Sequence, residues 1–136
     1  MGGLDSLRAT WQPYLLSVLR IVLGLLYMQH GLSKLFGFPG APPPNFTLFS
    51  LLGLAGILET FGGLAILLGF FTSPVAFILA GEMAFAFFMS HFPRGWFPLL
   101  NQGNLAILYC FVYLYLAAAG GGPWSVDAMR ARTARA

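Results

Sequence analysis

The chain has 136 residues, of which 58% are hydrophobic and only 8% charged, and its formal net charge is +3. An ordinary soluble domain has about 25% charged residues, and one of this length could not bury so much apolar surface in a single core. The composition therefore excludes a typical soluble domain and predicts an integral membrane protein embedded in a lipid bilayer. The small positive charge bears on orientation and gives no reason to expect a nucleic-acid partner.

Four apolar runs predict four transmembrane helices, at about residues 14–36, 48–71, 75–91 and 104–119. Each run is close to the roughly 20 residues that a hydrocarbon core of about 30 Å requires, and the third and fourth are slightly short. The intervening segments carry turn and loop signals, namely PGAPPPN, FTSPV and FPRGWFPLLNQG. We expect a single domain over residues 1–136, an all-α membrane protein folded as an antiparallel four-helix bundle.

The basic residues that flank these runs predict the orientation. Arg8 precedes the first run, and Arg130, Arg132 and Arg135 follow the last, whereas Lys34 and Arg94 lie on the opposite side. Basic residues accumulate on the cytoplasmic side of membrane proteins, so both termini are expected in the cytoplasm. The first apolar run starts late and no small-residue cleavage site follows it, which predicts a multi-pass protein of a bacterial-type inner membrane without a cleaved signal peptide.

Polar residues of the first run share one face. A period of 100° per residue brings four of them and two glycines into an arc of about 120°, whereas Gln29 and Ser33 fall on the opposite arc. The six residues of the arc are Arg20, Gly24, Tyr27, His30, Gly31 and Lys34. A charged side chain at the centre of a bilayer costs at least roughly 2.5–3.5 kcal/mol. This face is therefore expected to look into the bundle.

An inner layer of charge is predicted from helix rise. At about 1.5 Å per residue, Arg20, Glu59 and Glu82 come out at similar depths near the cytoplasmic side. We predict that Arg20 contacts at least one of these carboxylates and that Tyr113 has Glu59 as its partner. We consider two roles for this network equally. A buried ion network can fix the register of the helices, or it can carry protons or bind a ligand.

An outer polar layer is predicted near the opposite edge. His30, Lys34 and His91 fall there, and the outer loops contain no Asp or Glu. We therefore expect a donor-rich, acceptor-poor pocket lined by Tyr27, His30, Lys34, His91 and Trp96, which suits the carbonyl oxygens of a quinone or an anionic sulfur compound. Ordinary hydrogen bonding is the more common role for such histidines. Haem ligation is disfavoured because His91 falls at a helix end, and no metal site is expected.

The assembled motifs resemble the DoxX family of small four-helix membrane proteins. The resemblance lies in RIVLGLLYMQHGLSKLFG (20–37), ETFGGLAILLGFFTSPVA (59–76), EMAFAFFMSH (82–91) and GGGPWSVD (120–127). The family pattern maps to nine positions of this sequence: Arg20, His30, Gly31, Lys34, Glu59, Gly62, Gly63, Ser125 and Asp127. This sequence departs from the pattern at Asn104, where many relatives carry a Glu.

Three kinds of function are compatible with these features. The resemblance favours a subunit of a quinone-linked redox complex that binds a quinone without a redox centre of its own, since some family members look like subunits of sulfur oxidoreductases. Lone Cys110 excludes a dithiol mechanism within one chain. The alternatives are a non-catalytic membrane scaffold that binds protein partners, and a small transporter. A homo-oligomer is compatible with each of these functions, and whether the chain is an enzyme is left open.

Overall fold

The computed structural model describes residues 2–136, and within that range every regular element is a helix. Three helices are long and apolar enough to cross a membrane, at Gly3–Phe36, Leu51–Leu68 and Thr72–Arg94, and the apolar helix Asn104–Ala119 is shorter. Their segments are α1 (Gly3–Phe36), α2 (Leu51–Ile57), η1 (Leu58–Gly62), α3 (Gly63–Leu68), α4 (Thr72–Ala86), η2 (Phe87–His91), η3 (Phe92–Arg94), α5 (Pro98–Asn101), α6 (Asn104–Ala119) and α7 (Val126–Thr133).

Helix boundaries agree with the predicted ones to different degrees. The fourth run is confirmed, since α6 begins and ends at the predicted residues 104 and 119. The second helix begins at Leu51 rather than 48, because the hydroxyl of Ser50 accepts the backbone N–H of Gly53 and caps the first turn. The third begins at Thr72 rather than 75, and η2 carries it to the predicted end at residue 91.

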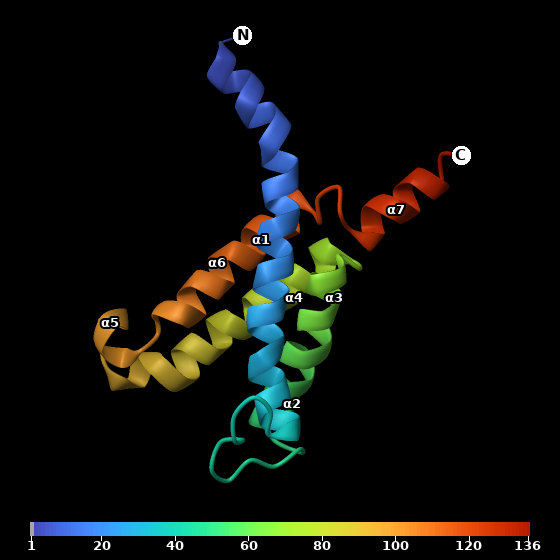
Figure 1. The fold of residues 1–136 in the computed structure, drawn as a ribbon. Helices are drawn as coiled ribbons and strands as arrows, with labels where there is room; N and C mark the ends of the chain where they lie inside the picture. Colours follow the sequence, from blue (N-terminus) through green and yellow to red (C-terminus); the bar gives the residue numbers. More distant parts are fainter. Residues whose placement is uncertain (1) are drawn as a thin grey trace.

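The largest difference is at the start of α1, which begins at Gly3 instead of residue 14. Pro13 lies inside the helix, and no Gly or further Pro interrupts residues 4–12. With 34 residues the helix is about 51 Å long, well beyond the roughly 30 Å of a hydrocarbon core. Its first turns project beyond the rest of the molecule in Figure 1.

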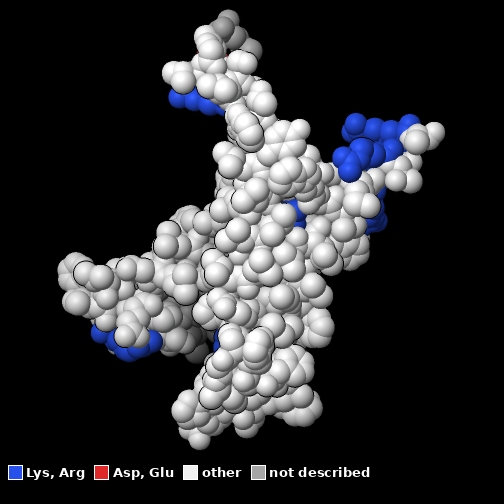
Figure 2. Space-filling view, viewed as in Figure 1, with Lys and Arg blue, Asp and Glu red and all other residues white. Residues whose placement is uncertain are grey.

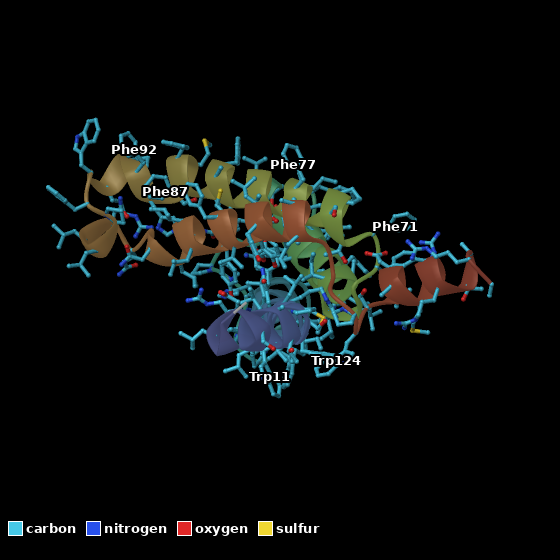
Figure 3. All side chains as sticks on the ribbon, turned by 90° about the horizontal axis from the view of Figure 1, so that it is seen from above. Trp11, Phe71, Phe77, Phe87, Phe92 and Trp124 are labelled. Carbon is cyan, nitrogen blue, oxygen red and sulfur yellow. The ribbon has the colours of Figure 1, made fainter. Side chains whose placement is uncertain are left out.

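The helices pack as two antiparallel pairs. The α2–η1–α3 helix runs back along α1, and α6 runs back along α4, while contacts between the pairs are fewer. The pairs meet near the end that carries the termini and diverge toward α2 and α5 (Figure 1). Figure 3, viewed from above, shows α4 and α6 side by side and extending away from α1. The expected bundle is therefore opened at the end away from the termini.

Close contacts at glycines set the register of α1 against its partner helix. Gly24 faces Leu67, and a Cβ atom on Gly63 would lie 2.9 Å from the Cα of Met28. Small residues allow membrane helices to approach this closely. The register that results places Glu59 near the end of α1, at Lys34, and Ile66 near Arg20.

Apolar side chains cover the outer surface. Large hydrophobic residues such as Phe77, Phe85 and Leu108 are more than half exposed, and Phe77 points outward from α4 in Figure 3. In Figure 2 the visible Lys and Arg side chains gather on α7, near the start of α1 and near α5, and most of the surface between them carries no charge. This distribution fits helices that face lipid along their middle.

Candidate functional site

Arg20 is fully buried and bonded to backbone carbonyl groups. Its Nε donates to the Gly121 carbonyl oxygen at 2.8 Å, and Nη1 donates to the Ile66 carbonyl oxygen at 2.7 Å. Further bonds go to the carbonyl oxygens of Leu67 and Trp124. Carbonyl groups at a helix C-terminus carry partial negative charge, so the end of α3 offsets the charge of the guanidinium.

The predicted contact of Arg20 with Glu59 or Glu82 is therefore wrong. The depth estimate assumed that each apolar run begins at the membrane edge, whereas α1 begins eleven residues earlier and the second helix three residues later. Glu59 instead forms an ion pair with Lys34, fourteen residues or about 21 Å along α1 from Arg20. The outer polar layer, which was expected to be poor in acceptors, therefore contains a carboxylate beside Lys34.

The Lys34–Glu59 pair lies inside the protein. The Glu59 side chain is 6% exposed and the Lys34 side chain 18% exposed. A buried pair of this kind adds little net stability but is destabilising to break, because the remaining charge has no partner. Together the two side chains place one positive and one negative charge inside the protein, with no net charge.

Glu82 is held by a tyrosine from α1. The Tyr27 hydroxyl donates to Oε2 of Glu82 at 2.6 Å. Within residues 2–136, the second oxygen of Glu82 and the hydroxyl of Tyr113 are buried without a hydrogen-bond partner. The predicted bond between Tyr113 and Glu59 is therefore not formed. The Tyr113 ring instead packs edge-on against Tyr27, with ring centroids 5.0 Å apart.

The two histidines lie on different helix pairs. His30 is exposed on α1, with its ring centroid 6.2 Å from that of Tyr109. Nδ1 of His91, in η2, lies 3.0 Å from the carbonyl oxygen of Asn101. Buried Asn101 also bonds to the backbone of Gly95 and Gly103, so it fixes the loop that carries it. In the part of the chain that the structure describes, no cluster of three metal-ligating side chains is present.

A cavity of about 530 Å³ lies between the helix pairs where they diverge. Apolar residues from α2, α4 and α6 line most of it, including Leu54, Met83 and Leu105. The polar side chains that the structure brings together around it are Tyr27, His30, Lys34, Glu59, Glu82, Ser90, His91, Gln102 and Tyr109. A cavity thus lies at the end where a pocket was expected, and it is not poor in acceptors, because both glutamates line it.

Trp96 does not join this cavity. Its side chain is 80% exposed, and its ring packs on that of Phe92, with centroids 5.0 Å apart. Asn104, the departure from the family pattern, is the exposed first residue of α6 and is likewise outside the cavity wall. Neighbouring Gln102 does line the cavity.

Asp127 has a role that sequence reasoning missed. Its carboxylate accepts the backbone N–H groups of Phe71 at 2.9 Å and Thr72 at 2.8 Å, and so caps α4 from a segment 55 residues away. Partial burial raises the pKa of Asp127, but these bonds and the charge of Arg130 outweigh that effect and lower it overall. The available signal in the sequence was the motif Ser125-Val126-Asp127. Its Ser125 caps α7, and its Asp127 caps α4.

Comparisons of the sequence with known proteins identify the family of this chain. The DoxX family model matches residues 15–92. An uncharacterized protein of Haemophilus influenzae is 37% identical over 122 residues, which cover 86% of this chain and 91% of that protein. The inner membrane protein YqjF of Escherichia coli is 35% identical over 119 residues, which cover 81% of this chain and 87% of that protein. No solved structure matches. The family match and the extent of these similarities show that this chain belongs to the DoxX family.

Proposed function

We propose that this chain is a multi-pass inner membrane protein that binds a quinone, or a similar small apolar molecule with ring oxygens, between its helix pairs. In this role it serves as a subunit of a membrane redox complex. The observation that carries the proposal is the cavity of about 530 Å³, whose walls are largely apolar and whose polar groups gather on a few side chains. Ligand pockets have this size and composition.

The chemistry of a quinone fits these walls. Its ring and tail require apolar surface, and its two oxygens require hydrogen-bond donors when oxidised. His30 and Lys34 carry donor groups at the cavity, and Glu59 and Glu82 are groups that can exchange protons with the ligand. With one cysteine the chain cannot form a dithiol redox pair of its own, and in this proposal the electrons pass between the quinone and a partner protein.

The location follows from relatives and charge. The Escherichia coli relative is named an inner membrane protein, and the basic residues of α7 together with Arg8 lie at the end with the termini. By the positive-inside rule that end is cytoplasmic. The cavity then opens in the outer half of the membrane.

Two features bear on the alternative functions. Arg20, Tyr113 and Leu116 are fully buried on the side of the cavity toward the termini, and a site closed on that side favours binding over transport. At the other end, the segment around α5 exposes Trp96, Phe97, Leu99 and Leu100, each at least 70% exposed. This apolar surface suits a protein partner, which both the redox-complex and the scaffold functions require.

Quinone binding by the purified protein tests the proposal. We expect quinone in solvent extracts of protein purified in mild detergent, and saturable binding of a short-chain quinone to the quinone-depleted protein. His30→Ala should weaken this binding about tenfold, the value of one or two hydrogen bonds, without lowering the melting temperature. Gln29→Ala, the exposed neighbour outside the cavity wall, is the matched control. Absence of quinone binding, or equal affinity in the two variants, would contradict the proposal.

A further inference from the structure

A second cavity lies under the proline-rich loop. It has a volume of about 490 Å³ and is lined by residues 39–44 of that loop together with Gln29, His30, Ser33 and Lys34 of α1. Most of these loop residues are exposed, and the loop is fastened to α1 by the Ser33 hydroxyl, which donates to the Gly40 carbonyl oxygen at 2.9 Å. We assign this cavity to the aqueous side at the end away from the termini, because an irregular loop exposed to hydrocarbon would leave its backbone groups without partners.

His30 and Lys34 line both cavities. They form a shared wall between the space under the loop and the space between the helix pairs. From this wall the polar groups continue inward, since Lys34 is paired with Glu59, and Glu82 lines the same inner cavity with Tyr27 bonded to it. One end of this series of polar groups lies near water and the other end is the carboxyl oxygen of Glu82 that has no partner within residues 2–136.

We propose that His30 and Lys34 form the wall of a one-sided polar passage, through which protons exchange between water at the proline-rich loop and the carboxyl groups of Glu59 and Glu82. In each exchange a proton leaves a carboxylic acid for water, or returns from hydronium to the carboxylate, and no electron moves. The passage rests on the proposed function in one respect, because a quinone bound in the inner cavity would take up protons on reduction and release them on oxidation.

The other end of the inner cavity is closed. Toward the termini, Tyr27 and Tyr113 are at most 1% exposed, and beyond them Arg20 is fully enclosed by backbone carbonyl groups. The other titratable groups that face the inner cavity are Tyr109 of α6 and His91 of η2. Protons from the side of the termini would have to cross this packed layer, so the exchange is assigned to the loop side.

Cysteine accessibility tests the passage directly. Cys110→Ala removes the one cysteine of the chain, and single cysteines then replace Ser33 on the loop cavity, Ala86 on the inner cavity or Leu108 on the outer apolar surface. The probe is a quaternary-ammonium methanethiosulfonate, which is charged and does not cross membranes. It is added to right-side-out or to inverted membrane vesicles, and the reactivity of Ser33→Cys defines the loop side.

We expect Ala86→Cys to react from the same side as Ser33→Cys and at least tenfold faster than Leu108→Cys. Adding His30→Trp should slow Ala86→Cys about tenfold and leave Ser33→Cys unchanged, because the bulky ring fills the shared wall. Met89→Cys, on the same inner wall, replaces Ala86→Cys if that variant is unstable. Reaction at the rate of the lipid-facing control, reaction from the other side, or no effect of His30→Trp would overturn the passage.

The two proposals can fail separately. If the inner cysteine does not react while the protein still binds quinone, the passage is wrong and the proposed function stands. If the inner cysteine reacts from the loop side but no quinone binds, the passage exists and the proposed ligand is wrong.

Discussion

The carbonyl cage around Arg20 predicts a large loss of stability when the guanidinium is removed. Arg20 is fully buried and donates to four carbonyl oxygens, two at the end of α3 and two in the segment after α6. Arg20→Met keeps most of the side-chain volume but removes the donor from all four carbonyl groups, of which, within residues 2–136, only that of Ile66 still accepts a backbone N–H, from Gly69. A hydrogen bond to a charged group contributes about 1.5–3 kcal/mol, and a buried acceptor left without a donor costs about 1–3 kcal/mol.

We therefore expect Arg20→Met to lower the free energy of unfolding by about 3–5 kcal/mol, the cost of two or three buried carbonyl groups left without a donor. For a chain of this size, this corresponds to a fall in melting temperature of about 10 °C or more. Thermal unfolding in detergent, followed by tryptophan fluorescence, measures it, and Trp124 lies in the affected segment because its carbonyl oxygen is one of the four acceptors. Arg20→Lys should fall between the wild type and Arg20→Met, since an ammonium group cannot reproduce the planar fork of donors.

Arg94→Met is the matched control. Arg94 is exposed and donates to the carbonyl oxygen of Ser90, four residues earlier in the chain. Its removal should cost less than about 1 kcal/mol, because water replaces the lost bond. Equal melting temperatures for Arg20→Met and Arg94→Met would refute the reasoning that Arg20 holds α1, the end of α3 and the segment after α6 together.

Two further predictions concern packing and pH. Gly63→Ala should destabilise the fold by about 1–3 kcal/mol, because its Cβ would lie 2.9 Å from the backbone of α1. Gly81→Ala has nothing within 4 Å of its Cβ and should stabilise α4 by about 0.5–1 kcal/mol. Equal melting temperatures for the two variants would contradict this prediction. Because the folded-state pKa of Asp127 lies below its unfolded value, its cap should contribute fully above about pH 4 and be lost as the pH falls through the folded pKa. Asp127→Asn should therefore be less stable than the wild type at pH 7 by about 0.5–2 kcal/mol. This difference in stability should become smaller below about pH 4. If the difference in melting temperature between the two proteins does not change with pH, the charge of Asp127 has no role.

The composition and the apolar runs were enough to predict an all-α protein with helices long enough to cross a membrane, and they gave the bounds of α6. They could not give the start of α1, because Pro13 is also compatible with a helix that continues through it. Helical phase did identify a polar face on α1, and Tyr27, His30 and Lys34 from that face line one cavity together with His91. Phase depends on residue spacing within one helix, which a sequence states directly.

Which polar groups meet across helices was decided by the tertiary structure. Close approach at Gly24 and Gly63 sets the register that pairs Glu59 with Lys34 instead of Arg20. The partners of Arg20 are backbone carbonyl groups, which every residue possesses and which no sequence pattern distinguishes. A sequence therefore determines which face of a helix is polar, whereas the partner of each polar group depends on how far two helices slide along each other before their small residues meet.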